Sequence, residues 1–195
     1  MKKISIIILL LSSFVFGQNL KLGEARGLFF GLGIGPRVPL GDFANNQNIG
    51  IGFDLTLAYT DNVLVPVFIY SKLGYQHFPG DQTYYKKSDY SAFSSDVIVA
   101  NLGVRYYLPP LIENIVIIMP VFEAGVSYAY YEKVHEFKID SGRRSYTEES
   151  SKTGLHVGVG VSMFLLDVIG YYNYLHNHQY MSLDLRIQIP IFLEM

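Results

Sequence analysis

Residues 180–195 read YMSLDLRIQIPIFLEM, and this stretch alternates between two kinds of side chain. Large apolar residues occupy the odd positions, namely Met181, Leu183, Leu185, Ile187, Ile189 and Ile191. Smaller or polar residues occupy the even positions, namely Ser182, Asp184, Arg186, Gln188 and Pro190. Because alternate side chains of an extended strand point to opposite faces, the stretch predicts a β-strand with one apolar face and one face bearing two charges.

The same alternation recurs along the chain. The segments that it predicts as strands are 26–36, 49–60, 65–77, 94–108, 117–132, 152–164, 167–174 and 180–193. Most of them reach the roughly 9–11 residues that a tilted strand needs to cross a bilayer. The connections between them alternate: 37–48, 78–93 and 133–151 are long, and 175–179 is shorter but polar, whereas those between, 61–64, 109–116 and 165–166, are trimmed. In an up-and-down meander this places all the long connections at one end.

Composition narrows the function classes. The chain of 195 residues is 50% hydrophobic and only 16% charged, against about 25% charged residues in a typical soluble domain. A formal net charge of −2 gives no reason to expect nucleic acid as a partner. The chain contains no cysteine, which excludes disulfides and thiolate metal sites.

The first residues indicate export. Lys2 and Lys3 precede an apolar run from Ile4 to Leu11 and then small residues, which is the layout of a cleaved signal peptide. We predict cleavage after Gly17, so that residues 1–17 are the signal peptide and residues 18–195 form one domain.

Two architectures share this alternation, because a soluble barrel points its apolar face inward and a membrane barrel points it outward. The second face of the strands is rich in Gly, Ala, Ser and Thr, with about one charge per strand, which is poor for a surface in water. Eight strands also leave an interior just wide enough for side chains, so a full set of bulky inward residues would be hard to seat. Tyr59, Tyr75, Tyr106 and Tyr128 lie near the ends of apolar rows, as in an aromatic girdle. We therefore expect an all-β, eight-stranded antiparallel transmembrane barrel, with a soluble periplasmic barrel as the alternative.

Six charged residues fall on the predicted inner face: Asp54, Lys72, Arg105, Glu123, Asp184 and Arg186. Three are cationic and three are anionic. Because a narrow lumen of low dielectric tolerates charge only when it is paired, we interpret them as a structural salt-bridge network inside the barrel. A functional ion path is the alternative.

The chain resembles the small outer-membrane β-barrels: the OmpA transmembrane domain, OmpX and the porin-like barrels of Bacteroidota. The residues that carry the resemblance are FVFGQ (14–18), GLFFGLGIGPRVPLGDF (27–43), VIVANLGVRYYL (97–108) and the closing strand 180–193. The resemblance implies a barrel in the bacterial outer membrane with both termini in the periplasm. It also implies a structural role, or one mediated by the long loops, with a narrow channel or carrier for small or hydrophobic solutes as the alternative.

Three candidate sites remain. Two lipid-modifying enzymes resemble this architecture, and both need a serine beside a histidine. His156 and Ser162 share a face but lie six residues apart, about 20 Å along a strand, so we expect no enzyme activity. His176 and His178, with His135, could bind metal, but two histidines with one spacer are a weak signal for a metal site without a third fixed ligand. GLGIG (31–35) and GVGVS (158–162) lie inside predicted strands with no following helix, so we interpret them as small inward residues and not as nucleotide loops.

We accordingly expect no catalytic residue, no cofactor and no metal. The expected partners are outer-membrane lipid and lipopolysaccharide, together with an extracellular ligand or protein that the long loops contact. The mixed-charge connection 133–151 is the longest of these loops. We expect the protein to be a monomer.

Overall fold

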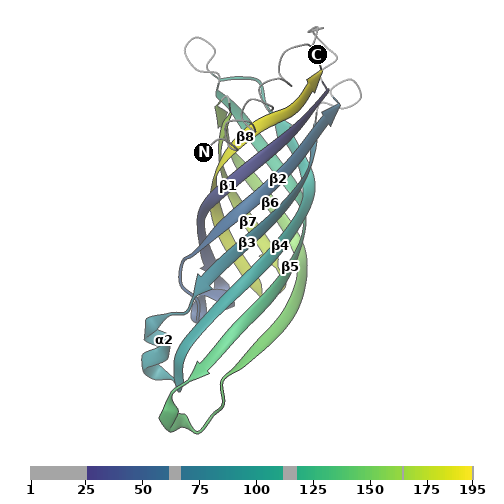
Figure 1. Cartoon of the computed structure of the whole chain (residues 1–195). Helices are drawn as coiled ribbons and strands as arrows, with labels where there is room; N and C mark the ends of the chain where they lie inside the picture. The colour runs from purple at the N-terminus through teal and green to yellow at the C-terminus, as the bar shows by residue number, and fades with distance from the viewer. Residues whose placement is uncertain (1–25, 62–66, 112–117, 164, 195) are drawn as a thin grey trace, which may run out of the picture.

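In a computed structural model of the chain, the described residues are 26–61, 67–111, 118–163 and 165–194. The predicted signal peptide lies outside them, as do parts of the predicted short connections. Within the described ranges, eight antiparallel strands follow one another in sequence order and close into a barrel (Figure 1). The strands are β1 (Arg26–Leu40), β2 (Gly50–Asp61), β3 (Phe68–Pro79), β4 (Tyr90–Tyr107), β5 (Ile118–Phe137), β6 (Tyr146–Met163), β7 (Leu166–Leu175) and β8 (His178–Glu194). The predicted fold class and all eight predicted strands are therefore confirmed.

Pairing between the first and last strands closes the ring. Gly33 on β1 pairs with Asp54 on β2 and with Arg186 on β8. Every strand thus has two hydrogen-bonded neighbours, and the sheet has no free edge. This matters in hydrocarbon, which offers no partner to an exposed backbone N–H or C=O group.

Three short helical segments lie at one end of the barrel, which we call the loop end: η1 (Gly41–Asn45), α2 (Gln82–Lys87) and η2 (Ile139–Ser141). In Figure 1 this is the lower end, and the β5–β6 hairpin extends furthest there. Among the described residues, no helix is long and apolar enough to cross a membrane.

The predicted long connections are shorter than expected because their flanks continue as strands. β1 runs on to Leu40, and the β5–β6 pairing continues as far as His135 opposite Tyr146. The mixed charges of segment 133–151 made it read as a loop, but they pair across the hairpin: Lys133 Nζ lies 3.9 Å from Glu148 Oε1. Antiparallel pairing satisfies the backbone there, so polarity alone does not end the strands.

The two faces have opposite character. Along β2 buried and exposed residues alternate strictly, with Asp54 and Thr56 buried and Phe53, Leu55 and Leu57 exposed. β8 follows the same rule: Asp184 and Arg186 are fully buried, while Leu185 and Ile187 are about half exposed. The apolar face therefore points out of the barrel and the charged face points in.

Candidate functional site

The first part of the interior network is built around Arg37 of β1. Its Nη2 donates to Asp54 Oδ2 on β2, and its Nη1 donates to Asp184 Oδ1 on β8, both at 2.5 Å. Lys72 Nζ on β3 lies 3.5 Å from the other Asp184 oxygen. One guanidinium on β1 thus bridges to both neighbouring strands, β2 and β8. The contact with β8 crosses the seam, which is the β1–β8 pairing that closes the barrel.

The second part is built around Glu123 of β5. One carboxylate oxygen accepts from Arg105 Nε at 2.7 Å and from Arg186 Nη1 at 3.0 Å. The other oxygen accepts from the Tyr171 hydroxyl at 2.7 Å, and that hydroxyl accepts from Arg186 Nη2 at 2.5 Å. Asp167 of β7 lies 3.6 Å from Arg105 and 3.9 Å from Arg186. Two arginines therefore share two carboxylates.

Lys72 joins the two parts, because its Nζ lies 4.0 Å above the Tyr171 ring while it faces Asp184. All six charged residues predicted for the inner face lie in this network, and each is at most 4% exposed. Two further members, Arg37 and Asp167, were not predicted from the sequence. With them the described interior holds four cations, Arg37, Lys72, Arg105 and Arg186, against four anions, Asp54, Glu123, Asp167 and Asp184.

Small inward residues make room for these long side chains. A Cβ on Gly52 would lie 2.6 Å from Arg37 Nε, and a Cβ on Gly158 would lie 2.5 Å from the Tyr171 ring. Both distances are shorter than real contacts of a Cβ atom. In the two segments that resemble nucleotide loops, Gly31 and Gly158 are thus inner-face residues beside large neighbours, since a Cβ on Gly31 would lie 3.1 Å from Arg186.

His156 has partners that the sequence did not indicate. Its Nδ1 lies 2.8 Å from Ser127 Oγ on β5, and its Nε2 makes a hydrogen bond with the Tyr70 hydroxyl on β3. The histidine is 1% exposed. A serine does meet the histidine here, but no carboxylate orients the ring, since both nitrogens are already engaged. The register of neighbouring strands, which brings Gly125 opposite His156, could not be read from one strand alone.

One apolar cluster closes the interior at the loop end, and a second one packs among the charged side chains. At the loop end, Phe43 of η1 points into the barrel mouth, where its ring lies 4.9 Å from Phe78 and 4.8 Å from His178. The segment after η1 is tied down by Gln47 Nε2, which donates to Ser95 Oγ at 2.7 Å. Val121, Ile169 and Tyr171 form the second buried cluster, in which the Tyr171 hydroxyl also bonds to Glu123 and Arg186.

The three histidines considered for metal do not converge. His178 packs against Phe43, whereas His135 stacks on Tyr146 with ring centroids 4.5 Å apart and approaches Glu148 at 3.3 Å. His176 is exposed in the β7–β8 turn. No group of three metal-binding side chains is found among the described residues.

The loop end forms a fixed platform. Asp81 caps α2 by accepting from the backbone N–H groups of Thr83 and Tyr84, and these bonds lower the pKa of its carboxyl group. Lys138 Nζ, beyond the end of β5, donates to the carbonyls of Tyr85 at 2.9 Å and Ser88 at 2.7 Å. The β5–β6 hairpin is therefore attached to α2. At its tip Ile139 is 99% exposed.

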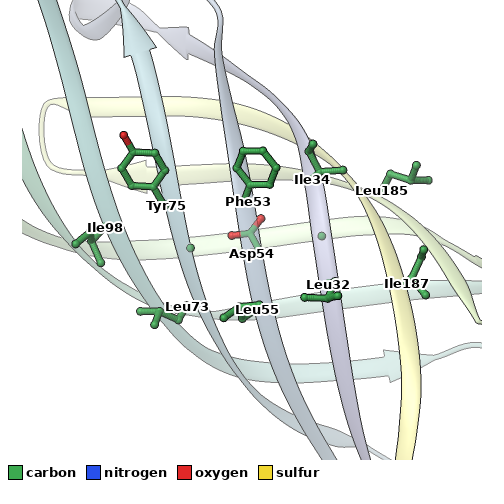
Figure 2. Close-up of a pocket in the computed structure, with 12 residues that line it drawn as sticks. Leu32, Ile34, Phe53, Asp54, Leu55, Leu73, Tyr75, Ile98, Leu185 and Ile187 are labelled. Atoms are coloured by element: carbon green, nitrogen blue, oxygen red, sulfur yellow. The ribbon is translucent and has the colours of Figure 1, made fainter. Parts of the chain in front are cut away.

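The outer face is hollowed by a groove of about 730 Å³ across β8, β1, β2, β3 and β4 (Figure 2). Its walls are two rows of apolar side chains: Ile34, Phe53 and Tyr75 in one, Leu32, Leu55 and Leu73 in the other. Gly33 and Gly74 lie in the floor. The Asp54 carboxylate belongs to the interior, where it binds Arg37.

No protein-family model and no curated protein matches the chain. Among solved structures, Neisserial surface protein A is similar with a TM-score of 0.52 and 15% identity, over 85% of this chain and 97% of that one. Ail, the attachment invasion locus protein of Yersinia pestis, gives 0.49 and 12% over 86% and 100%, and the N-terminal β-barrel domain of Pseudomonas aeruginosa OprF gives 0.46 and 11% over 85% and 100%. The likeness to Neisserial surface protein A concerns the fold, which is that of the small eight-stranded outer-membrane barrels.

Proposed function

We propose that the protein is a monomeric outer-membrane barrel whose interior is closed to solutes and whose loop end contacts ligands or proteins outside the cell. The observation that carries the proposal is the reversed polarity of the sheet. Leucine and isoleucine rows lie half exposed on the outside while eight charged side chains are buried inside. In water this arrangement would leave the apolar surface exposed to solvent while the charges are buried. In a bilayer the apolar face contacts hydrocarbon and the charged side chains pair with one another inside the barrel. Membership of the Bacteroidota-type barrels stays a prediction.

The location is tested by fractionation of the expressing cells. We expect the protein in the outer-membrane fraction, with faster gel mobility before boiling than after it. Recovery in the soluble periplasmic fraction would favour the soluble barrel instead.

The closed interior is supported by the paired charges, by the apolar cluster at the loop end and by the second cluster packed among the charges. Single-channel recording in planar bilayers tests it. We expect no stable conductance, and a reproducible open level would favour the channel or carrier.

The role of the loop end is supported by its fixed geometry, since Lys138 holds the hairpin on α2. Because the chain has no cysteine, Ile139→Cys gives a single reporter at the hairpin tip. We expect a membrane-impermeant maleimide to label it on intact cells. Ser127→Cys, inside the barrel, is the matched control that should stay unlabelled; equal labelling of both would contradict the proposal.

We further propose that the protein is not an enzyme. The support is the His156 site, which is enclosed and lacks a carboxylate to orient the ring. Lipid A or phospholipid turnover by the purified protein that is lost in His156→Ala would overturn this.

A further inference from the structure

We propose that the open edge of β6 at the loop end binds the C-terminal tail of another protein as an added strand, and that Lys152 holds the terminal carboxylate of this tail. The proposal deepens the proposed function, because it names the kind of partner that the loop end takes, and it rests on that function. Three observations support it: an uncovered strand edge, a turn that closes this edge on the membrane side, and a cation without an ion pair near that turn.

The sheet formed by β4, β5 and β6 extends beyond the other strands at the loop end and therefore has two edges there (Figure 1). The β4 edge is covered. Pairing of β4 with β3 stops at Ser94. Beyond it, the Tyr85 hydroxyl of α2 donates to the Phe93 carbonyl at 2.7 Å and accepts from the Phe93 N–H at 2.9 Å. One side chain thus takes the place of a neighbouring strand at this residue.

The β6 edge is open. Residues Tyr146–Thr153 pair with β5 on one side, whereas pairing with β7 on the other side begins only at Gly154, opposite Leu175. Within the described ranges, no backbone hydrogen bond from a loop or turn reaches this open stretch. Such an edge presents a row of unpaired N–H and C=O groups, to which an extended segment can add as a further strand. Because the chain covers one edge and not the other, the β6 edge is the place where a partner strand fits.

The β7–β8 turn limits what can be added. β7 ends at Leu175 and β8 begins at His178. Because Leu175 lies opposite Gly154, this turn stands in line with the open stretch, at the place where an added strand would otherwise continue towards the membrane. The incoming chain must therefore end there or leave the sheet. A chain terminus meets this condition without a bend.

The inner face of the open stretch has groups that suit a carboxylate. Lys152, Ser150 and Glu148 share this face because alternate residues of a strand point the same way. Glu148 already lies 3.9 Å from Lys133 and 3.3 Å from His135. Among the described side chains, Lys152 forms no ion pair, and the buried Ser150 hydroxyl has no hydrogen-bond partner. An unpaired cation and an unused hydroxyl donor thus lie close to the turn.

These groups select a C-terminus. A strand parallel to β6 runs towards the membrane and brings its terminal carboxylate to Lys152, whereas an antiparallel strand would bring its N-terminal ammonium to the same lysine and be repelled. Parallel pairing is slightly less stable per residue than antiparallel pairing, so the charge contact sets the direction. β8 of this chain ends with Glu194 opposite Arg26, at the other end of the barrel. A second copy in the same membrane therefore does not present its own tail here, and the partner is a different protein outside the cell.

Fluorescence anisotropy with the purified, folded protein in detergent tests the proposal. The probe is a peptide of about seven residues, rich in threonine and valine, with the dye at its N-terminus. We expect the peptide with a free C-terminal acid to bind about fivefold more tightly than the C-terminal amide, the scale of one exposed charge pair. The acid should lose this advantage in Lys152→Gln and keep it in Lys87→Gln, a matched loss of an exposed cation on α2.

Backbone methylation of the probe tests the addition of a strand. Two further peptides carry N-methyl groups on alternate backbone nitrogens, in the two possible frames. We expect one frame to abolish binding and the other to leave it unchanged, because only every second N–H group of the added strand faces β6. A peptide prolonged at its C-terminus by a flexible tail should bind no better than the amide, because its carboxylate no longer stops at the β7–β8 turn.

Each contrary outcome overturns the inference. Equal binding of acid and amide, or an unchanged preference for the acid in Lys152→Gln, removes the capture of a terminus and assigns the edge to internal strands. Binding of both methylated peptides as tightly as the parent removes strand addition. Heat-modifiable mobility of the same sample separates the two levels. A sample without it counts against the membrane barrel itself, whereas a folded sample that binds no peptide counts against this inference alone.

Discussion

Glu123→Gln removes the anion that two buried arginines share while keeping the shape of the side chain. Glu123 accepts from Arg105 at 2.7 Å and from Arg186 at 3.0 Å, and all three side chains are fully buried. Breaking a buried ion pair from one side leaves an uncompensated charge and costs about 3–5 kcal/mol. Asp167, at 3.6 Å and 3.9 Å, is too distant to replace both contacts. We therefore expect the free energy of unfolding to fall by about 3–5 kcal/mol.

Urea unfolding in detergent or vesicles, followed by heat-modifiable gel mobility, measures this change. Glu136→Gln, an exposed change on the same strand, is the control and should shift the free energy by less than about 0.5 kcal/mol. The double variant Glu123→Gln/Arg105→Gln restores the charge balance, so it should be more stable than the sum of the single losses predicts. A loss below about 1 kcal/mol for Glu123→Gln, or strict additivity in the double variant, would refute the view that charge pairing holds the interior together.

Three further predictions follow from other parts of the barrel. Leu55→Arg on the outer face should cost about 2–4 kcal/mol in a bilayer, as measured by the same unfolding assay, whereas a soluble barrel would tolerate it. Phe43→Ala should lower stability by about 3–5 kcal/mol yet leave planar bilayers without conductance, because the charge network beneath it is intact; a new conductance would show that Phe43 alone seals the lumen. Lys138→Ala should raise the rates of proteolysis and hydrogen exchange in α2 and η2, whereas the unfolding midpoint of the barrel should change no more than it does for a surface substitution. A large fall in that midpoint would contradict the view that the loop end is separate from the barrel.

The fold could be predicted from the sequence because a period of two is a local signal. In β8 the alternation from Met181 to Ile191 is unbroken, and the burial of each residue follows from it. The alternation alone does not say whether the apolar face points into or out of the barrel. The limited volume of an eight-stranded interior and the low charge of the second face predicted that it points outward, and the structure agrees.

The two missed members of the network lie where that local signal fails. Arg37 stands between Pro36 and Val38, and prolines at 36 and 39 made the segment read as a connection. Asp167 is the second residue of β7, whose tyrosine-rich sequence hides the alternation. Partners from distant strands, such as Ser127 with His156, depend on register, which a single sequence does not specify.

The pairing of Arg37 with Asp184 has a consequence for how the barrel assembles. The two residues are 147 positions apart, on the first and last strands, so a nascent chain holds the arginine long before its second carboxylate has been synthesised. Closing the barrel between β1 and β8 is then the step that brings Arg37 to Asp184. An intermediate still open between β1 and β8 would hold the same four cations and four anions but without this ion pair, so closure of the barrel should be strongly downhill.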